Sequence, residues 1–331
     1  MKALLVVGNG ITIDLIQTFK IKNVDAMNMF RLGAEVTTPT TNEKGFLSNK
    51  HCKHLWALGA RPGLAENEAM QIIENIITCG NVVSLDPSSD PASMNDNIYM
   101  QAYYELTSYL RSLFVEYNRR FDMPSHDLIN KWGWVRKISE LADNPGVEEI
   151  TIISFNYDIF IERLLINLGI KFNCPPFTSS ENKISIIKPH GSIAFKRKNG
   201  TATKPIVKES FENLDINEIE VDFNSVAHDD AYVPLIPPAG DSNRGQAKWI
   251  QQLQKCCLER AKGLSESDLL IIGGLSYWSV DRLEIDKILV ALPRSVSCKM
   301  VNPNSPPSLD MVVSALFKNY TLYTTIDSLD I

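Results

Sequence analysis

Near its amino terminus the chain reads Ala3-Leu4-Leu5-Val6-Val7-Gly8-Asn9-Gly10-Ile11-Thr12. The first five residues form an uninterrupted apolar run, which is typical of a strand buried on both faces of a parallel sheet. Two glycines follow, and a helical pattern begins near Asp14. Glycine after such a strand lets the backbone approach a phosphate, and a helix N-terminus favours negative charge. The stretch therefore predicts an α/β nucleotide-binding unit, although only part of the G-x-G-x-x-G pattern is present.

Two polar motifs follow apolar runs farther along the chain. They are Phe155-Asn156-Tyr157-Asp158 and Lys188-Pro189-His190-Gly191-Ser192. Ligands of open α/β sheets bind outside the carboxyl ends of the strands, so both motifs are offered to the same kind of crevice. An asparagine and an aspartate can hold a ribose, and a histidine can take a proton at neutral pH. We therefore expect Asn156 and His190 to be catalytic and Asp158 to contact the ligand.

Two more segments extend this pattern. The apolar run at 269–272 leads into Gly273-Gly274-Leu275-Ser276, and an amphipathic helix is predicted at about 280–290. A further strand at 296–301 ends in Asn302-Pro303-Asn304. Strands that alternate with helices in this way indicate parallel βαβ units. The prediction is an α/β, Rossmann-like fold with a mostly parallel sheet, helices on both faces and a helical insertion.

The insertion is predicted between the first strand and the strand that precedes Asn156. Apolar residues recur there at helical spacing, first between 106 and 114 and again between 128 and 141. We place the insertion at about 45–145. A chain of 331 residues can bury a large core. We expect one domain over residues 1–331.

Charge and hydropathy limit the classes of partner. The net charge is −6, and the longest basic run is Lys196-Arg197-Lys198, so direct binding of nucleic acid is not expected. No apolar stretch approaches the roughly 18 residues that span a bilayer. We therefore predict no membrane association and a cytoplasmic location.

The cysteine pattern argues against a structural metal. The chain has six cysteines and no C-x-x-C pair, so a zinc ribbon of the usual spacing is not predicted. We expect the cysteines to be reduced and structural, and we expect no metal. They are Cys52, Cys79, Cys174, Cys256, Cys257 and Cys298.

Taken in order, these segments resemble the sirtuin family. Sirtuins have a glycine-rich first loop, a Gln-Asn-x-Asp motif, a catalytic His-Gly, a later Gly-Thr-Ser loop and an Asn near the adenosine end of NAD. The corresponding positions here are Gly8-Asn9-Gly10, Phe155-Asn156-Tyr157-Asp158, His190-Gly191, Gly274-Leu275-Ser276 and Asn302.

The chain departs from the sirtuin pattern at several of these positions. Asn9, Phe155 and Leu275 replace the usual Ala, Gln and Thr, and the four-cysteine zinc module is missing. The Gly-Asn-Gly start and the Pro-His-Gly-Ser run are more similar to divergent sirtuin-like NAD-cleaving proteins of bacterial antiphage defence. The resemblance does not extend over residues 37–149.

The resemblance implies that NAD is the substrate and that the chain is an NAD glycohydrolase, an NAD-depleting effector of antiphage defence. Asn156 would hold the ribose or a water molecule, and His190, as neutral imidazole, would be the general base. It also implies a homo-oligomer and, as a further partner, an ATPase or a nucleic-acid sensor protein. The NAD-binding residues it implies are Gly8, Asn9, Gly10, Asp14, Asp158, Gly274, Ser276 and Asn302.

Several of these residues also have simpler interpretations. Asp158 is equally suited to cap the helix predicted from residue 159, and Asp14 to decorate the first helix. Asn156 suits a left-handed turn, and His190 suits the end of a strand. Two other functions stay open: a nucleotide-sensing or scaffold subunit of a defence complex, and an NAD-dependent protein deacylase. The missing zinc module ranks the deacylase below glycohydrolysis.

Overall fold

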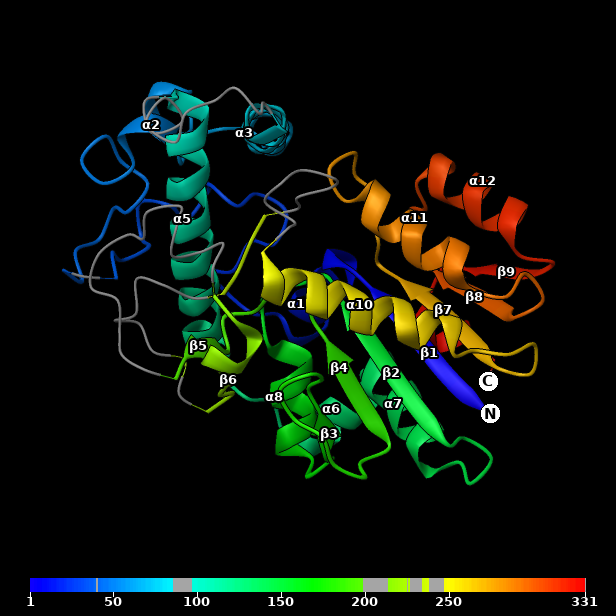
Figure 1. Ribbon diagram of the computed structural model, residues 1–331. Coiled ribbons are helices and arrows are strands. Elements are labelled where there is room, and N and C mark those ends of the chain that lie inside the picture. Colours follow the sequence, from blue (N-terminus) through cyan, green and yellow to red (C-terminus); the bar gives the residue numbers. More distant parts are fainter. Residues whose placement is uncertain are drawn as a thin grey trace.

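The computed structural model describes residues 1–39, 41–85, 97–198, 214–224, 226, 234–237 and 247–330. Among these residues, seven parallel strands form one sheet in the order β3-β4-β2-β1-β7-β8-β9 (Figure 1). The strands are β1 (Lys2–Val7), β2 (Glu149–Ser154), β3 (Phe172–Asn173), β4 (Ile184–Ile187), β7 (Leu269–Gly273), β8 (Ser297–Val301) and β9 (Asn319–Tyr323).

The strand order defines a topological switch point. The chain builds outward from β1 to β2 and β4, then returns to place β7 on the other side of β1. Apart from the short edge strand β3, this is the order of doubly wound dinucleotide-binding sheets. The predicted Rossmann-like α/β fold with a parallel sheet is confirmed, and the switch point lies between β1 and β7.

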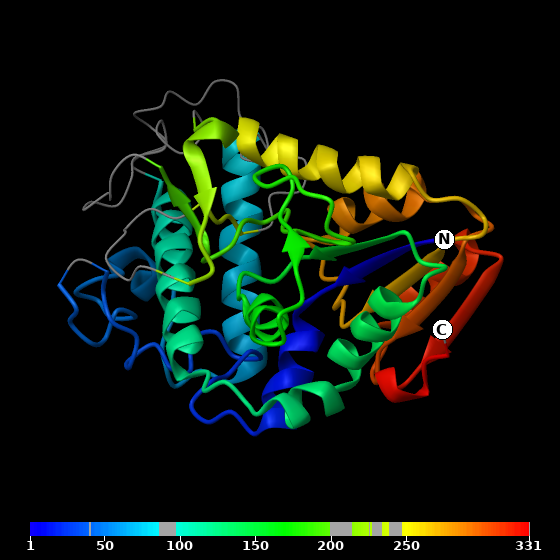
Figure 2. The same cartoon turned by 90° about the horizontal axis from the view of Figure 1, so that it is seen from below.

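Helices cover both faces of the sheet (Figure 2). On one face lie α10 (Lys248–Lys262) and α11 (Arg282–Ala291), with α12 (Pro307–Leu316) packed beside α11. The other face carries α1 (Asn9–Phe19), α7 (Gly133–Asp143) and α8 (Phe160–Asn167). The smaller elements are an antiparallel pair, β5 (Phe195–Arg197) and β6 (Ile219–Val221), and the 3-10 turns η1 (Ile216–Glu218) and η3 (Ile326–Ser328).

A helical excursion lies between α1 and β2, as predicted. Besides α7 it comprises α2 (Lys53–Ala57), α3 (Glu66–Leu85), α5 (Ile98–Arg120) and α6 (His126–Lys131). Figure 1 shows α2, α3 and α5 grouped beyond the carboxyl ends of the strands. Two tyrosine hydroxyls of α5 anchor the loop that follows α1: Tyr109 donates to Met29 O at 2.6 Å and Tyr117 to Asp25 O at 2.8 Å. None of the described helices is long and apolar enough to cross a membrane.

The central strands end at one level. Val7 is paired with Ser154 of β2 on one side and with Gly273 of β7 on the other, and Gly273 is paired in turn with Val301 of β8. The apolar side chains of β1 are buried, as expected for a strand covered on both faces. The loops after β1, β2, β7 and β8 therefore begin side by side at the same edge.

The first helix begins earlier than predicted. Helix α1 starts at Asn9 rather than near Asp14, and Gly10 lies in its first turn. Glycine has low helix propensity, so this start is not visible in the pattern. Contact with the loop after β7 stabilises it: Gly8 N donates to Gly273 O at 3.0 Å and Gly10 N to Gly274 O at 2.9 Å.

This contact generates a stability prediction. A Cβ at Gly10 would lie 2.6 Å from Gly274 Cα, so Gly10→Ala must push the two loops apart. We expect a loss of about 1–3 kcal/mol in the free energy of unfolding, measured by urea denaturation. Gly63→Ala is the control, because no described atom lies within 4 Å of a Cβ there. Equal stability of the two variants would contradict the contact.

Candidate functional site

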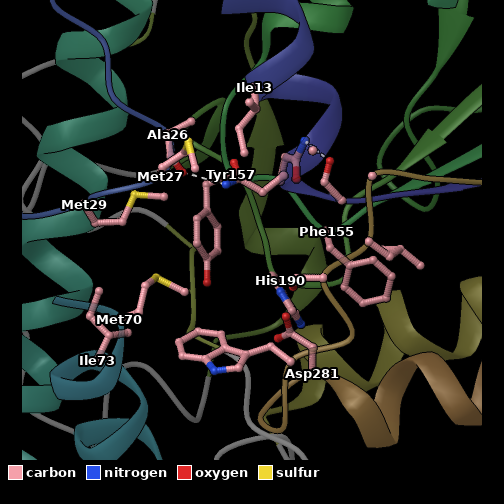
Figure 3. A pocket seen from close by; sticks show the side chains of 18 of the residues that line it. Ile13, Ala26, Met27, Met29, Met70, Ile73, Phe155, Tyr157, His190 and Asp281 are labelled. Carbon is pink, nitrogen blue, oxygen red and sulfur yellow. Dashed lines mark hydrogen bonds between the residues drawn. The ribbon is translucent and has the colours of Figure 1, made fainter. Parts of the chain in front are cut away.

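One cavity of about 440 Å³ opens at the carboxyl ends of the strands (Figure 3). It lies at the switch point, where ligands of such sheets bind, and its volume is typical of small-molecule sites. Asp14 is the only predicted site residue that does not line it. Those that do are Gly8, Asn9, Gly10, Asn156, Asp158, His190, Gly274, Ser276 and Asn302.

The glycines allow the loop after β1 and the loop after β7 to contact each other closely, which the sequence pattern does not predict. The N–H groups of Gly8 and Gly10 already donate to the loop after β7, so they are not available to a phosphate. Gly274 has φ of +60°, and a Cβ on it would lie 2.6 Å from Ile11 N. Glycine is therefore required here because two backbones meet. The predicted approach of these loops to a phosphate stays a prediction, and such a contact would use groups other than the N–H groups of Gly8 and Gly10.

Asn156 belongs to a buried network of directed hydrogen bonds. Its Nδ2 donates to Gly8 O at 3.1 Å and to Thr12 Oγ1 at 3.0 Å. Thr12 Oγ1 in turn donates to Asp158 Oδ2 at 2.7 Å. Because a carbonyl oxygen only accepts, Gly8 O fixes the orientation of the Asn156 amide. Only the Oδ1 acceptor of Asn156 is left for a ligand.

Asp158 lies between the cavity and the first turn of α8. It lines the cavity, but both carboxylate oxygens already have protein partners. Oδ2 accepts from Thr12, and Oδ1 accepts from the N–H of Phe160 at 3.1 Å, within the first turn of α8. The residue at the N-cap position itself is Ile159, and its side chain makes no capping bond. Asp158 therefore holds the start of α8 and the Asn156 network together.

Two asparagines among the predicted site residues, Asn9 and Asn302, connect the loops around the cavity. Asn9 Nδ2 donates to Ala26 O at 2.6 Å, which ties α1 to the loop that α5 anchors. Asn302 Nδ2 donates to Leu275 O at 3.2 Å and its Oδ1 accepts from Asn304 N at 3.1 Å, which ties the loop after β8 to the loop after β7. Ser276 is exposed at the rim.

The backbone around His190 is held tightly from two sides. Gly191 has φ of +80°, and a Cβ there would lie 2.1 Å from Pro234 O, so no other residue fits this turn. His190 O accepts from Ile236 N at 3.0 Å. On the other side Lys188 is buried and pairs with Glu162 of α8 at 2.7 Å, and it also donates to Asp158 O.

The imidazole of His190 is paired with a carboxylate that the sequence did not identify. His190 Nε2 lies 2.7 Å from Glu284 Oε2, and both side chains are at most 5% exposed. Burial acts to lower the pKa of His190, but the charge of Glu284, its hydrogen bond and the charge of Asp281 together raise that pKa above its usual value. The imidazole that we expect to act as general base is therefore held by a buried carboxylate.

Asp281 is a second unpredicted carboxylate. It lines the cavity beside His190 (Figure 3), and its Oδ1 is buried without a hydrogen-bond partner among the described residues. It occupies the N-cap position of α11, yet its side chain makes no capping bond. Burial raises the pKa of Asp281 to about 6, while the charge of His190 lowers it and that of Glu284 raises it.

The wall opposite these polar groups is apolar and comes from the segment between α1 and β2 (Figure 3). It combines the loop after α1 with helices α3 and α5, and three of its side chains are methionines. Unbranched thioethers fill irregular space and adapt to different ligands. The wall residues are Met27, Met29, Met70, Ile73, Ile77, Leu110 and Phe114.

Asp14, which the resemblance places among the NAD-binding residues, does not line the cavity. Its neighbour Ile13 lines the cavity, and consecutive helical residues are turned by about 100° from one another. The Asp14 carboxylate instead accepts from Trp132 Nε1 at 2.7 Å. Burial raises the pKa of Asp14, and the bond from Trp132 lowers it in part. Asp14 thus joins α1 to the junction of α6 and α7.

The comparisons with known proteins add no identity. No protein-family model matches the chain, and no curated protein matches it. Within the described residues, no group of three or more His, Cys, Asp or Glu side chains is arranged to hold a metal ion. The six cysteines are free thiols.

A local signal for the missed carboxylates is present in the sequence. Asp281-Arg282-Leu283-Glu284 opens the helix that follows the second glycine loop. Carboxylates three residues apart lie on one helical face, so a pair at this place can reach the strand ends together. Their partner His190 is 94 residues away from Glu284, which no spacing rule connects.

The buried pair behind His190 predicts a stability effect. Lys188→Met leaves Glu162 buried without its partner, which costs about 3–5 kcal/mol. The double variant Lys188→Met/Glu162→Leu should recover much of that loss, because no uncompensated charge remains. Thermal unfolding followed by circular dichroism measures both. A Lys188→Met protein that melts like the wild type would show that the pair does not hold this strand end.

Proposed function

We propose that the chain binds NAD in this cavity and hydrolyses its nicotinamide–ribose bond, giving nicotinamide and ADP-ribose. One observation carries the proposal: residues that follow five different strands (β1, β2, β4, β7 and β8), and that correspond to the sirtuin motifs, line a single cavity at the switch point. On the same resemblance, we propose that the chain acts as an NAD-depleting effector in antiphage defence.

The pyrophosphate would bind without basic side chains. Among the described residues that line the cavity there is no lysine or arginine. The N-termini of α1 and α12 both border it, through Asn9 and Pro306, and helix N-termini carry partial positive charge. Asn302 and Ser276, on neighbouring loops, would contact the adenosine half.

The bond would break heterolytically. The electron pair of the C1′–N1 bond leaves with the ring nitrogen, so nicotinamide departs neutral and the positive charge moves to the ribose. Asn156 Oδ1, the free acceptor of its network, would hold a ribose hydroxyl or orient the water molecule. Water then adds to C1′, and its proton passes to the His190–Glu284 pair.

The tautomer of His190 follows from its partner. When the imidazole is neutral, Nε2 carries the hydrogen, because it faces a carboxylate oxygen at 2.7 Å. The lone pair is then on Nδ1, which we propose as the base. The second candidate function, a nucleotide-binding subunit without catalysis, uses the same cavity but requires no base.

Loss of the proposed base, His190, should strongly slow the cleavage of NAD. We expect His190→Ala to release nicotinamide from NAD more slowly by a factor on the order of 10² to 10⁴, as removal of a general base usually does. Liquid chromatography of nicotinamide measures this. His126→Ala is the matched control, because His126 is exposed at the start of α6. Unchanged turnover in folded His190→Ala protein would refute the assignment, and no turnover in the wild type would favour the binding subunit.

The pH profile should report the His190–Glu284 pair. Because Glu284 helps to raise the pKa of His190, the base form appears, and kcat/KM rises, only above the ordinary titration range of histidine. Glu284→Gln removes the charge that raises this pKa, while burial still lowers it, so the rise should move to lower pH. A profile that stays in place would mean that another group is the base.

A further inference from the structure

The cavity has an acidic end that the cleavage reaction leaves unexplained. Among the described residues that line the whole cavity there are three carboxylates, Glu66, Asp158 and Asp281, and Asp281 is the one that lies beside His190. Asp158 has partners for both oxygens, whereas within the described part of the chain Asp281 Oδ1 and Glu284 Oε1, which form the acidic end beside His190, are buried without one. Such atoms lose their hydration without compensation, so they need an explanation.

A structural role does not account for Asp281. An aspartate at an N-cap normally accepts a backbone N–H of the first turn, but this side chain makes no capping bond. The nearest basic side chain on its helix, Arg282, stacks 4.9 Å from the ring centroid of Tyr277, which does not line the cavity. The negative charge of Asp281 is thus balanced in part by His190, which Glu284 already holds.

Charge and surface at this end match a flat organic cation. A positive charge beside Asp281 would offset the lost hydration of its carboxylate, because Coulomb attraction is strong where water is excluded. Tyr157 and Phe155 contribute aromatic rings around His190, with the Phe155 ring centroid 5.1 Å from that of His190. A small inorganic cation would leave the apolar surroundings of the cavity unused.

We propose that this end of the cavity binds a cationic heteroaromatic ring through Asp281. Resting on the proposed function, that ring is the pyridinium of oxidised NAD, so the site distinguishes NAD from NADH by charge. Asp281 would then also stabilise the positive charge as it moves from the ring to the ribose. Asp281 would thus be a residue for substrate selection that lies outside the motifs shared with sirtuins.

A pair of small probes tests this without any catalysis. The cation 1-methylnicotinamide and neutral nicotinamide share the ring and the carboxamide, and calorimetry gives the affinity of each. At pH 8 we expect the wild type to bind the cation at least tenfold more tightly. Asp281→Asn should remove that preference and keep the affinity for nicotinamide. Asp286→Asn is the matched control on the same helix: its carboxylate bonds Tyr277, and it does not line the cavity.

The preference should weaken at low pH. Asp281 has a pKa of about 6, so at pH 5 it is largely neutral. His190, which faces Asp281 together with Glu284, is protonated there and repels a cation. Both changes act in the same direction, so a preference that is as large at pH 5 as at pH 8 would contradict the role of Asp281.

The outcomes separate this inference from the proposed function. Equal affinities of the wild type for both probes would overturn the inference even if NAD is cleaved. A preference that survives in Asp281→Asn would overturn it as well. A cation preference that Asp281→Asn abolishes, together with tighter binding of NAD than of NADH, would support it even if no nicotinamide is ever released, in which case only the cleavage proposal fails.

Discussion

The close contact between two backbone loops constrains the centre of the sheet and the cavity beside it. The loop after β1 and the loop after β7 approach so closely that Gly10 N donates to Gly274 O at 2.9 Å, and neither glycine has room for a Cβ. This contact joins the strands on both sides of the switch point and sets the floor of the cavity. Asn156 donates to Gly8 O in the same floor, so the polar groups of β2 are aligned against it.

Structural features that depend on short stretches of sequence could be predicted well. Buried parallel strands are continuous apolar runs, and the polar motifs that follow them are placed by strand register, so the fold and the strand-end residues of the cavity are accessible from sequence. The differences between prediction and structure have physical causes. Asp14 is one residue from the cavity-lining Ile13, and a turn of about 100° directs it to Trp132. The early start of α1 depends on a tertiary contact with Gly274, which overrides helix propensity.

The pairing of His190 with Glu284 could not be predicted in the same way. It joins a loop after β4 to the first turn of α11, across the sheet, and depends on how α11 packs rather than on any local pattern. The same holds for the apolar wall. The sequence indicates helices in the insertion, but it does not indicate where α3 and α5 lie relative to the sheet. Their position follows from tertiary packing, which includes the hydrogen bond from the Tyr109 hydroxyl to Met29 O. The His190–Glu284 pair and the apolar wall therefore become apparent only in the folded structure.

The insertion is one continuous excursion that leaves the sheet after α1 and returns before β2. Its helices α3 and α5 and the loop they anchor form one wall of the cavity, while the asparagines, His190 and Asp281 come from elsewhere in the fold. The pairing of β1 with β2 involves none of the residues of that wall. Evolution can therefore exchange or resize the wall, and with it the range of molecules admitted, while the polar groups at the strand ends are inherited unchanged.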